Sequence, residues 1–269
     1  MADKRNVIGI LSIKGGAGKT SCAVNLASAL SYEFGQKVLA VDANYSVPNL
    51  GIHFGITGQK ITLNEVLRKN LHISHAISRY NENLHIVPGS VIGRKVNPFE
   101  LKQKIDSVKN NYDSVIIDSS PHLNHEMVST IAAANVLFAV TTPDYPTLSC
   151  TLHAINAANR RKIPISGIIL NKVRNKKFEL SLDEIEDACG TPVIAVIPED
   201  IAMLESLAMA KPVIIHSPNS QSSINFKKLA AAIADREYED PRFMSRLKEL
   251  FRSSIPKDEL NRAEFRSRA

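Results

Sequence analysis

The chain lacks the features that mark secreted, disulfide-stapled and membrane-spanning proteins. It holds three cysteines in 269 residues, with no CxxC pair and no zinc spacing. No apolar run approaches the roughly 20 residues needed to cross a bilayer. The opening Met-Ala-Asp-Lys-Arg passes directly into an apolar segment and does not resemble a signal peptide. We therefore expect a cytoplasmic protein whose cysteines are small core residues.

Metal-ligating patterns and internal repeats are also absent from the sequence. The eight histidines show no ligand spacing, and His122 with His125 alone would be too few for zinc. Without closely spaced cysteines, an iron–sulfur role is disfavoured. The formal net charge is +6, with many of the basic residues after residue 240. A basic end favours anionic partners such as lipid head groups or nucleic acid, although a solvated basic surface explains it equally well.

Apolar runs that alternate with helical patterns predict the fold. The runs lack the period-two alternation of a one-sided sheet, which indicates parallel strands covered on both faces. We predict an α/β fold, a doubly wound, mostly parallel sheet with helices on both faces. The main domain is placed at residues 1–237 and a C-terminal tail at 238–269. The expected strands lie at 7–13, 37–42, 83–88, 114–118, 136–140, 165–170 and 192–197, and helical patterns near 20–34, 98–110, 124–134, 147–160, 180–189, 200–209 and 221–235.

A glycine-rich turn between the first run and the first helical pattern is the most informative segment. Residues 14–20 read Lys-Gly-Gly-Ala-Gly-Lys-Thr. In such a turn, backbone N–H groups and the positive end of the following helix attract phosphate. Lys19 supplies a cation for the outer phosphates, and Thr20 supplies a hydroxyl for Mg²⁺. The nucleotide-binding residues predicted here are Gly15, Gly16, Ala17, Gly18, Lys19, Thr20 and Ser21.

Two aspartates end apolar runs of the same predicted sheet. Asp42 ends the run after the first helix, and Asp118 ends a later one. Ligands bind at the carboxyl edge of parallel strands, so both carboxylates are expected beside the phosphate loop. With Thr20 they are predicted to hold Mg²⁺, partly through water. One aspartate at a strand end can simply cap a turn, but two beside a phosphate loop weaken that alternative.

These motifs together resemble the ParA/MinD family of deviant Walker A P-loop ATPases. The resemblance covers roughly residues 5–235 in matching order, which a single motif could not produce by chance. The adenine-side motif around Pro198 is closer to MinD-like than to ParA-like members, and residues 140–144 resemble the archaeal branch. The matching segments are 14–20 for the Walker A loop, 41–51 for switch I, 118–121 for Walker B and switch II, and 170–173 and 196–200 for the adenine side.

The resemblance implies a protein that binds ATP or ADP with Mg²⁺ and forms a homodimer around ATP. Lys14 matches the family's signature lysine, which reaches the nucleotide of the partner protomer, where a cation offsets phosphate charge. The position inside the glycine loop favours this role over that of a solvent-facing lysine. The residues implied on the adenine side are Asn171, Pro198, Glu199 and Asp200, and the catalytic set is Lys14, Lys19, Asp42, Asn44 and Asp118.

Asn44 departs from the family pattern, because MinD-like proteins carry a second aspartate in this slot. An amide can orient a water but is no useful base at neutral pH. Phosphoryl transfer depends mainly on positioning and charge, so the change need not abolish turnover. We therefore predict a slow ATPase with a long-lived ATP-bound dimer. An engineered trapping substitution would leave the same sequence.

Residues 242–255 form an amphipathic helical pattern that resembles the membrane-targeting helix of MinD-like proteins. It implies binding to an anionic membrane surface, strengthened when a dimer holds two copies. Packing on the chain's own core or on a protein partner is a nearly equal alternative. The polar residues 257–269 are expected to fray. The apolar face of the helix consists of Phe243, Met244, Leu247, Leu250 and Phe251.

The leading functional interpretation is a MinD-like ATPase switch that controls membrane or partner association. It would position a division, polarity or surface-appendage system from the inner face of the cell membrane, together with a regulatory or cargo protein. A ParA-like DNA-binding segregation ATPase is the first alternative, with Lys172, Arg174, Lys176 and Lys177 as DNA contacts. A largely non-hydrolysing, nucleotide-gated scaffold for protein partners is the second.

Overall fold

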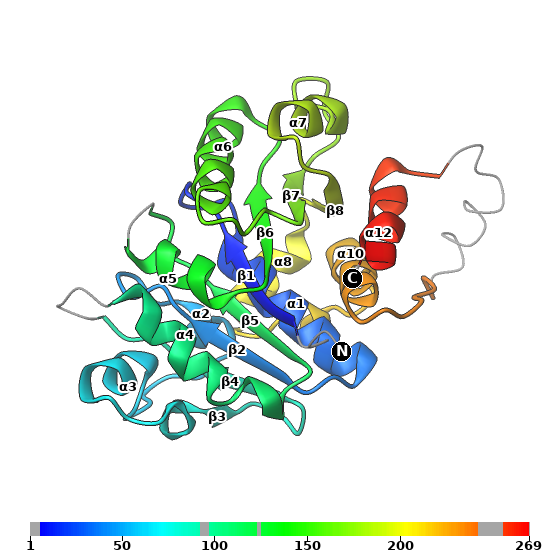
Figure 1. Ribbon diagram of the computed structural model, residues 1–269. Coiled ribbons are helices and arrows are strands. Elements are labelled where there is room, and N and C mark those ends of the chain that lie inside the picture. Colours follow the sequence, from blue (N-terminus) through cyan, green and yellow to red (C-terminus); the bar gives the residue numbers. More distant parts are fainter. Residues whose placement is uncertain (1–5, 92–96, 123–124, 242–254, 269) are drawn as a thin grey trace.

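The computed structural model describes residues 6–91, 97–122, 125–241 and 255–268, and within them one eight-stranded sheet runs through the molecule (Figure 1). Its strands are β1 (Asn6–Leu11), β2 (Val38–Asp42), β3 (Ser78–Arg79), β4 (Leu84–Val87), β5 (Ser114–Asp118), β6 (Val136–Thr141), β7 (Gly167–Val173) and β8 (Val193–Pro198). Their spatial order is β3-β4-β2-β5-β1-β6-β7-β8. All neighbouring pairs are parallel except β3–β4. The predicted doubly wound sheet is confirmed.

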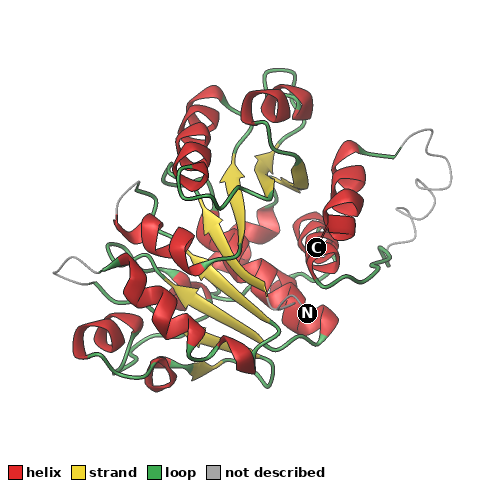
Figure 2. Ribbon diagram, viewed as in Figure 1, coloured by secondary structure: helices red, strands yellow, loops and turns green. Residues whose placement is uncertain are grey.

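Helices cover both faces of this sheet (Figure 2). The described helices are α1 (Lys19–Phe34), α2 (Leu50–His53), α3 (Leu63–Lys69), α4 (Pro98–Asp106), α5 (His125–Ala133), α6 (Tyr145–Asn159), α7 (Leu182–Cys189), α8 (Ile201–Ala208), α9 (Val213–His216), α10 (Gln221–Ile233) and α12 (Lys257–Arg268), with 3₁₀ turns at Ile73–Ala76 and Lys109–Asn111. α1 packs against α10 and strands β1, β2 and β5, whereas α5 packs on α4 and β1, and α6 packs on β6 and α7. The long apolar runs are therefore strands buried on both sides.

The central strands are almost entirely buried, which explains their uninterrupted apolar sequences. Ile8 and Ile10 of β1 are fully buried in a cluster with α1 and α10, while Leu11 faces a second cluster with α5 and α6. Residues that alternate along one strand thus enter different cores, so both faces demand apolar side chains. This packing fixes the carboxyl ends of β1, β2, β5, β6 and β7 along one edge of the sheet.

The cysteine prediction is confirmed for two of the three residues. Cys22 and Cys189 are buried and Cys150 is partly buried, and all three are free thiols. Burial raises the pKa of the Cys189 thiol to about 11, which keeps it protonated and unreactive. Among the described residues, no helix is both long enough and apolar enough to cross a bilayer. The same residues hold no group of three or more His, Cys, Asp or Glu placed for a metal ion.

The expectation that residues 257–269 fray is wrong for the described part of that segment. They form α12, which packs on β8 and α10 (Figure 1). Arg262 is buried and donates to the Ile194 carbonyl (3.0 Å) and to Asp258 (2.6 Å). Asn261 donates to the Val193 carbonyl at 2.9 Å. β8 is an edge strand, and α12 supplies polar partners along it, which composition alone did not indicate.

The predicted amphipathic segment lies almost wholly outside the described residues. Phe243, Met244, Leu247, Leu250 and Phe251 are therefore not placed by the structure, and their role stays a prediction. The described chain resumes at Ile255, an exposed residue. In the sequence this segment lies between α10 and α12, which both pack on β8. The division into a domain at 1–237 and a tail at 238–269 also stays a prediction.

Candidate functional site

The predicted site residues converge on one pocket at the carboxyl edge of the sheet. The pocket has a volume of about 470 Å³ and is bordered by the turn before α1, the loop after β2, the end of β7 and the start of α8. Asp42 and Asp118 are not in its lining, but Asp118 contacts two residues that are. The predicted residues that line the pocket are Lys14, Gly15, Gly16, Ala17, Gly18, Lys19, Thr20, Ser21, Asn44, Asn171, Pro198, Glu199 and Asp200.

Two glycines of the phosphate loop have backbone conformations that other residues adopt at a cost. Gly16 has φ +80° and Gly18 has φ +92°. Gly18 is also the N-cap of α1, and no side chain caps that helix. The first N–H groups of a helix have no partners within it, so those of α1 are left for a ligand at the pocket. This geometry fits a phosphate group.

The end of β7 supports the phosphate loop through two side chains. Asn171 Nδ2 donates to the Ala17 carbonyl at 2.8 Å, and Lys172 Nζ donates to the Gly16 carbonyl at 2.8 Å. A Cβ atom built on Gly18 would lie 2.1 Å from Asn171 Nδ2. These two side chains bind the loop carbonyls of Ala17 and Gly16, so the loop N–H groups are the ones available to a phosphate in the pocket. Asn171, expected on the adenine side, therefore also contacts the loop itself.

Lys19 and Thr20 meet at the Walker B aspartate. Lys19 Nζ lies 2.8 Å from Asp118 Oδ1, and the Thr20 hydroxyl donates to Asp118 Oδ2 at 2.7 Å. Asp118 is fully buried, and Lys19 is 7% exposed. A buried carboxylate with a lysine and a hydroxyl is satisfied only because all three residues pack at the junction of β5 and α1. Thr20 and Asp118 place two hard oxygen donors together, as Mg²⁺ requires.

Asp42 lies next to Asp118 across the β2–β5 pair, but its carboxylate has backbone partners. It accepts from Asn44 N at 3.2 Å and from Leu50 N at 3.0 Å. Burial, followed by the negative charge of Asp118, raises the pKa of Asp42 to about 7 despite these two hydrogen bonds. With Lys19 as the nearby cation, the protonated form of Asp42 is still favoured more than in an exposed carboxyl group. Its predicted contact with Mg²⁺ stays a prediction.

Asn44 uses both ends of its side-chain amide to close the switch I loop. Its Nδ2 donates to the Val47 carbonyl at 2.5 Å, and its Oδ1 accepts from Val47 N at 3.2 Å. An aspartate could accept from Val47 N but could not donate to the carbonyl. The asparagine thus has a structural role in this conformation, although it borders the pocket.

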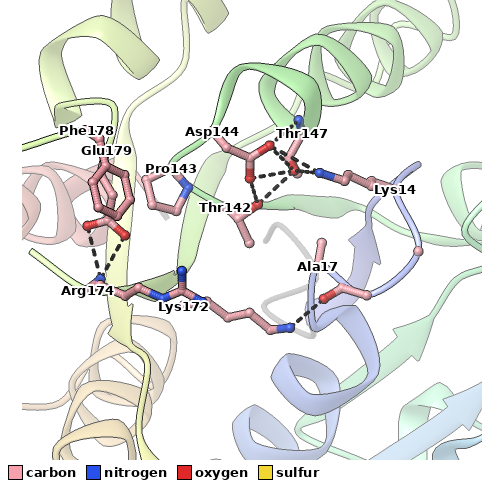
Figure 3. A pocket seen from close by; sticks show the side chains of 12 residues that line it. Lys14, Ala17, Thr142, Pro143, Asp144, Thr147, Lys172, Arg174, Phe178 and Glu179 are labelled. Atoms are coloured by element: carbon pink, nitrogen blue, oxygen red, sulfur yellow. Dashed lines mark hydrogen bonds and ion pairs between the residues drawn. The ribbon is translucent and has the colours of Figure 1, made fainter. Parts of the chain in front are cut away.

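Lys14 is bound to its own chain in this structure. Its Nζ donates to Thr147 Oγ1 at 2.7 Å and lies 3.2 Å from Asp144 Oδ1, at the start of α6 (Figure 3). Burial alone would raise the pKa of Asp144, but hydrogen bonds from Thr142, Thr147 and Lys14 lower it to about 2. The acceptor is therefore a firmly ionised carboxylate, although the ion pair is about two-fifths exposed.

The adenine-side residues line the pocket, yet two of their carboxylates have other partners. Asp200 caps α8 through Ala202 N and also accepts from Ser222 N, each at 3.0 Å. Glu199 forms a two-point ion pair with Arg174. The lining here is apolar, from Met203, Leu204 and Leu207. Such side chains can contact a base, while the engaged carboxylates shape the loop around it.

Two of the four residues predicted as DNA contacts bind other residues of the protein. Lys172 supports the phosphate loop, and Arg174 pairs with Glu199. The other two members, Lys176 and Lys177, are exposed cations at the surface. Two lysines give a weak electrostatic footprint for nucleic acid.

Sequence reasoning missed several residues of the site. Asp144 and Thr147, which hold Lys14, follow the end of β6, and position at a strand end was the available signal. His53 of α2 lines the pocket, and burial lowers the pKa of its imidazole, which favours the neutral form. The support of the phosphate loop by Lys172 had no sequence signal, because it depends on an irregular end of β7 where Lys172 has φ +58°.

A glycine cradle at a strand–helix junction, with a lysine and a threonine on a buried aspartate, defines a P-loop nucleotide-binding protein. The chain belongs to the family described as "CobQ/CobB/MinD/ParA nucleotide binding domain", whose model matches residues 8–213. The match includes the loop, both strand-end aspartates and the adenine-side segments. The chain is therefore a member of the MinD/ParA-like ATPase family.

Individual relatives agree with this assignment. An uncharacterized ATP-binding protein of the archaeon Methanocaldococcus jannaschii is 34% identical over 231 residues, which are 85% of this chain and 88% of the relative. The septum site-determining protein MinD of Thermotoga maritima is 30% identical over 242 residues, which cover 85% of this chain and 88% of the relative. The structure of MinD complexed with Mg-ADP from Pyrococcus horikoshii superposes with a TM-score of 0.79 at 32% identity. The superposition covers 85% of this chain and 96% of the MinD chain. The resemblance to MinD-like proteins is confirmed.

Proposed function

We propose that this chain is an ATP- and Mg²⁺-dependent switch that dimerises around ATP and hydrolyses it slowly. The observation that carries the proposal is the meeting of Lys19 and Thr20 on buried Asp118, beneath an uncapped helix N-terminus. Phosphoryl transfer requires mainly positioning and positive charge, and this cluster supplies both. The Mg-ADP bound to the Pyrococcus horikoshii MinD structure supports the same nucleotide class.

The donor set fits Mg²⁺. Thr20 and Asp118 would hold it, with Asp42 contributing through water once a cation lowers its pKa. Bound there, the ion would neutralise developing charge on the phosphates. Lys19 and the loop N–H groups would orient the phosphate chain, while the exposed side chains of Leu204 and Leu207 would cover the base.

Lys14 supplies the trans contact in the proposed dimer. It must leave Asp144 and Thr147 to do so, and that step couples the ATP-bound dimer to the start of α6. We expect K14A to abolish dimerisation with a non-hydrolysable ATP analogue, measured by sedimentation velocity. We expect D144A to strengthen dimerisation a few-fold, because a half-exposed ion pair is worth at most about 1 kcal/mol.

Lys60→Ala is the control for these variants, since Lys60 is an exposed lysine distant in sequence from the loop. It should dimerise like the wild type. ATP-dependent dimers of K14A as stable as those of the wild type would rule out the trans role. An unchanged D144A would mean that the Lys14–Asp144 contact does not oppose dimerisation.

The engagement of Asn44 by Val47 favours a second candidate, a nucleotide-gated scaffold with negligible turnover. In that case the ATP-bound form would recruit protein partners and persist. Asn44→Asp separates the two functions. The aspartate loses the donor to the Val47 carbonyl but can still accept from Val47 N, so it places a carboxylate at the pocket in a loop that is closed by one bond in place of two. We expect single-turnover hydrolysis to rise by at least about tenfold, since positioned acid–base groups contribute more than that.

Asn159→Asp is the control, because Asn159 is an exposed asparagine that does not line the pocket, so the new charge stays in water. An Asn44→Asp rate equal to or below that of the wild type would contradict the inference that Asn44 limits hydrolysis. Tight ATP binding with no turnover in either form would favour the scaffold.

We further propose that the segment around Phe243 and Leu247 attaches the ATP-bound dimer to an anionic membrane. Two weak helices in one dimer gain through effective concentration. A truncation after Asp240 is a poor test, because it also removes α12 from β8. We expect full-length chain with Phe243 and Leu247 both changed to serine to lose ATP-dependent sedimentation with phosphatidylserine-containing vesicles.

Exchanging exposed Leu260 of α12 for serine provides the control for the vesicle assay. That variant should sediment like the wild type. Vesicle binding that is independent of ATP, or unchanged in the double-serine variant, would count against attachment through this segment.

A further inference from the structure

Glu126 connects the switch I loop, which borders the nucleotide pocket, to the start of α5. It stands in the first turn of α5, soon after the Walker B aspartate, and its side chain reaches the switch I loop. Glu126 Oε2 accepts from Tyr45 N at 3.1 Å, and Oε1 accepts from the Ser46 hydroxyl. Hydrogen bonds to an ionised carboxylate are about twice as strong as neutral ones. The sequence pattern gave Glu126 no role.

The segments that follow β2 and β5 are already joined by a backbone hydrogen bond at the ends of these strands. Ala43 N donates to the Asp118 carbonyl at 2.9 Å, directly where β2 and β5 end. Beyond that point the two loops diverge, one through Asn44 and the other through Pro121, and both of these residues line the pocket. Glu126 adds a second connection, from the first turn of α5 to the switch I loop. A displacement of the start of α5 is therefore transmitted to switch I.

Tyr45, whose N–H donates to Glu126, explains how this contact influences the pocket. Tyr45 is 3% exposed and belongs to the buried cluster under α4 and α5. The side chain of Tyr45 is buried and its N–H is bound by Glu126, so its backbone is fixed. The adjacent residue Asn44 therefore has few backbone conformations open to it. Asn44 in turn sets the position of Val47 at the pocket. The orientation of the loop thus depends on a carboxylate that does not line the pocket.

We propose that Glu126 is a positioning residue that couples the switch I loop to the start of α5 and thereby sets the rate of ATP hydrolysis. The inference rests on the proposed ATPase function. Glu126 does not touch the nucleotide pocket, so its loss should affect turnover more than substrate binding. A misplaced group in an active site can cost up to about 100-fold in rate.

The test compares E126A with E126Q in the full-length chain. We expect E126A to lower kcat about tenfold while KM for ATP stays within about twofold. Glutamine can accept from Tyr45 N with its oxygen and donate to the Ser46 hydroxyl with its nitrogen, so E126Q should stay within about threefold of wild-type kcat. Hydrogen exchange should show a faster Tyr45 amide in E126A than in wild type or E126Q.

E100A is the matched control. Glu100 lies in the first turn of the neighbouring helix α4, so its removal takes away the same favourable interaction with a helix dipole that E126A takes away in α5. It should leave kcat and Tyr45 exchange unchanged. The proposal is overturned if E126A keeps wild-type kcat and Tyr45 protection, or if E126Q is as slow as E126A. A wild-type chain that binds ATP without hydrolysing it would refute the ATPase function alone, and the Tyr45 exchange would then decide the role of Glu126.

Discussion

Replacing Lys19 by alanine is expected to weaken ATP binding by about 10- to 150-fold and to destabilise the fold. The binding loss follows because charge-assisted hydrogen bonds to phosphate are worth about 1.5–3 kcal/mol each. The stability loss follows because Asp118 is fully buried and Lys19 lies 2.8 Å from it. Removing one partner of a buried ion pair costs about 3–5 kcal/mol. Isothermal titration with ATP and urea unfolding measure the two effects.

A double variant separates these two effects of Lys19. In K19A/D118N the buried carboxylate is gone, so the free energy of unfolding should recover by more than half, while ATP binding stays lost. Lys60→Ala, which changes an exposed lysine, should alter neither quantity. Wild-type ATP affinity in K19A would refute the assignment of this loop as the phosphate site.

Gly18→Ala is expected to lower the free energy of unfolding by about 3 kcal/mol or more. A left-handed conformation costs an L-residue about 1–2 kcal/mol, and Gly18 has φ +92°. The new methyl group would also overlap Asn171 Nδ2, at 2.1 Å, and break the bond from Asn171 to the Ala17 carbonyl. A lost buried hydrogen bond adds about 1–3 kcal/mol. Urea unfolding of the nucleotide-free protein is the measurement.

The same loop supplies matched controls for Gly18. Gly16 has φ +80°, but a methyl group added there would meet nothing within 4 Å, so G16A should show only the conformational cost of about 1–2 kcal/mol. Gly15 has neither constraint, and G15A should stay within about 0.5 kcal/mol of wild type. Equal losses in all three variants would show that the contact with Asn171 has no energetic weight.

Much of the site was predictable because its residues lie at positions that the fold itself defines. Once the apolar runs are read as parallel strands, Asp42 and Asp118 must lie at one edge of the sheet beside residues 14–20. The confirmed strand pattern therefore brought the predicted phosphate and adenine-side residues to one pocket. The polar composition of residues 257–269 led to the wrong prediction that this segment frays. Its order depends on buried Arg262, which donates to a carbonyl of the edge strand β8, and composition does not show that contact.

The sequence by itself determined the doubly wound sheet, the phosphate loop and the family. Each of these depends on local periodicity or on residues adjacent in the chain. Only the tertiary structure decided that Lys14 is bound by Asp144, that Asn44 closes its own loop and that Glu126 ties switch I to α5. Asp144 and Glu126 lie 130 and 81 residues away from the partners they bind. Such pairings follow from how packed elements approach one another, and no local pattern encodes them.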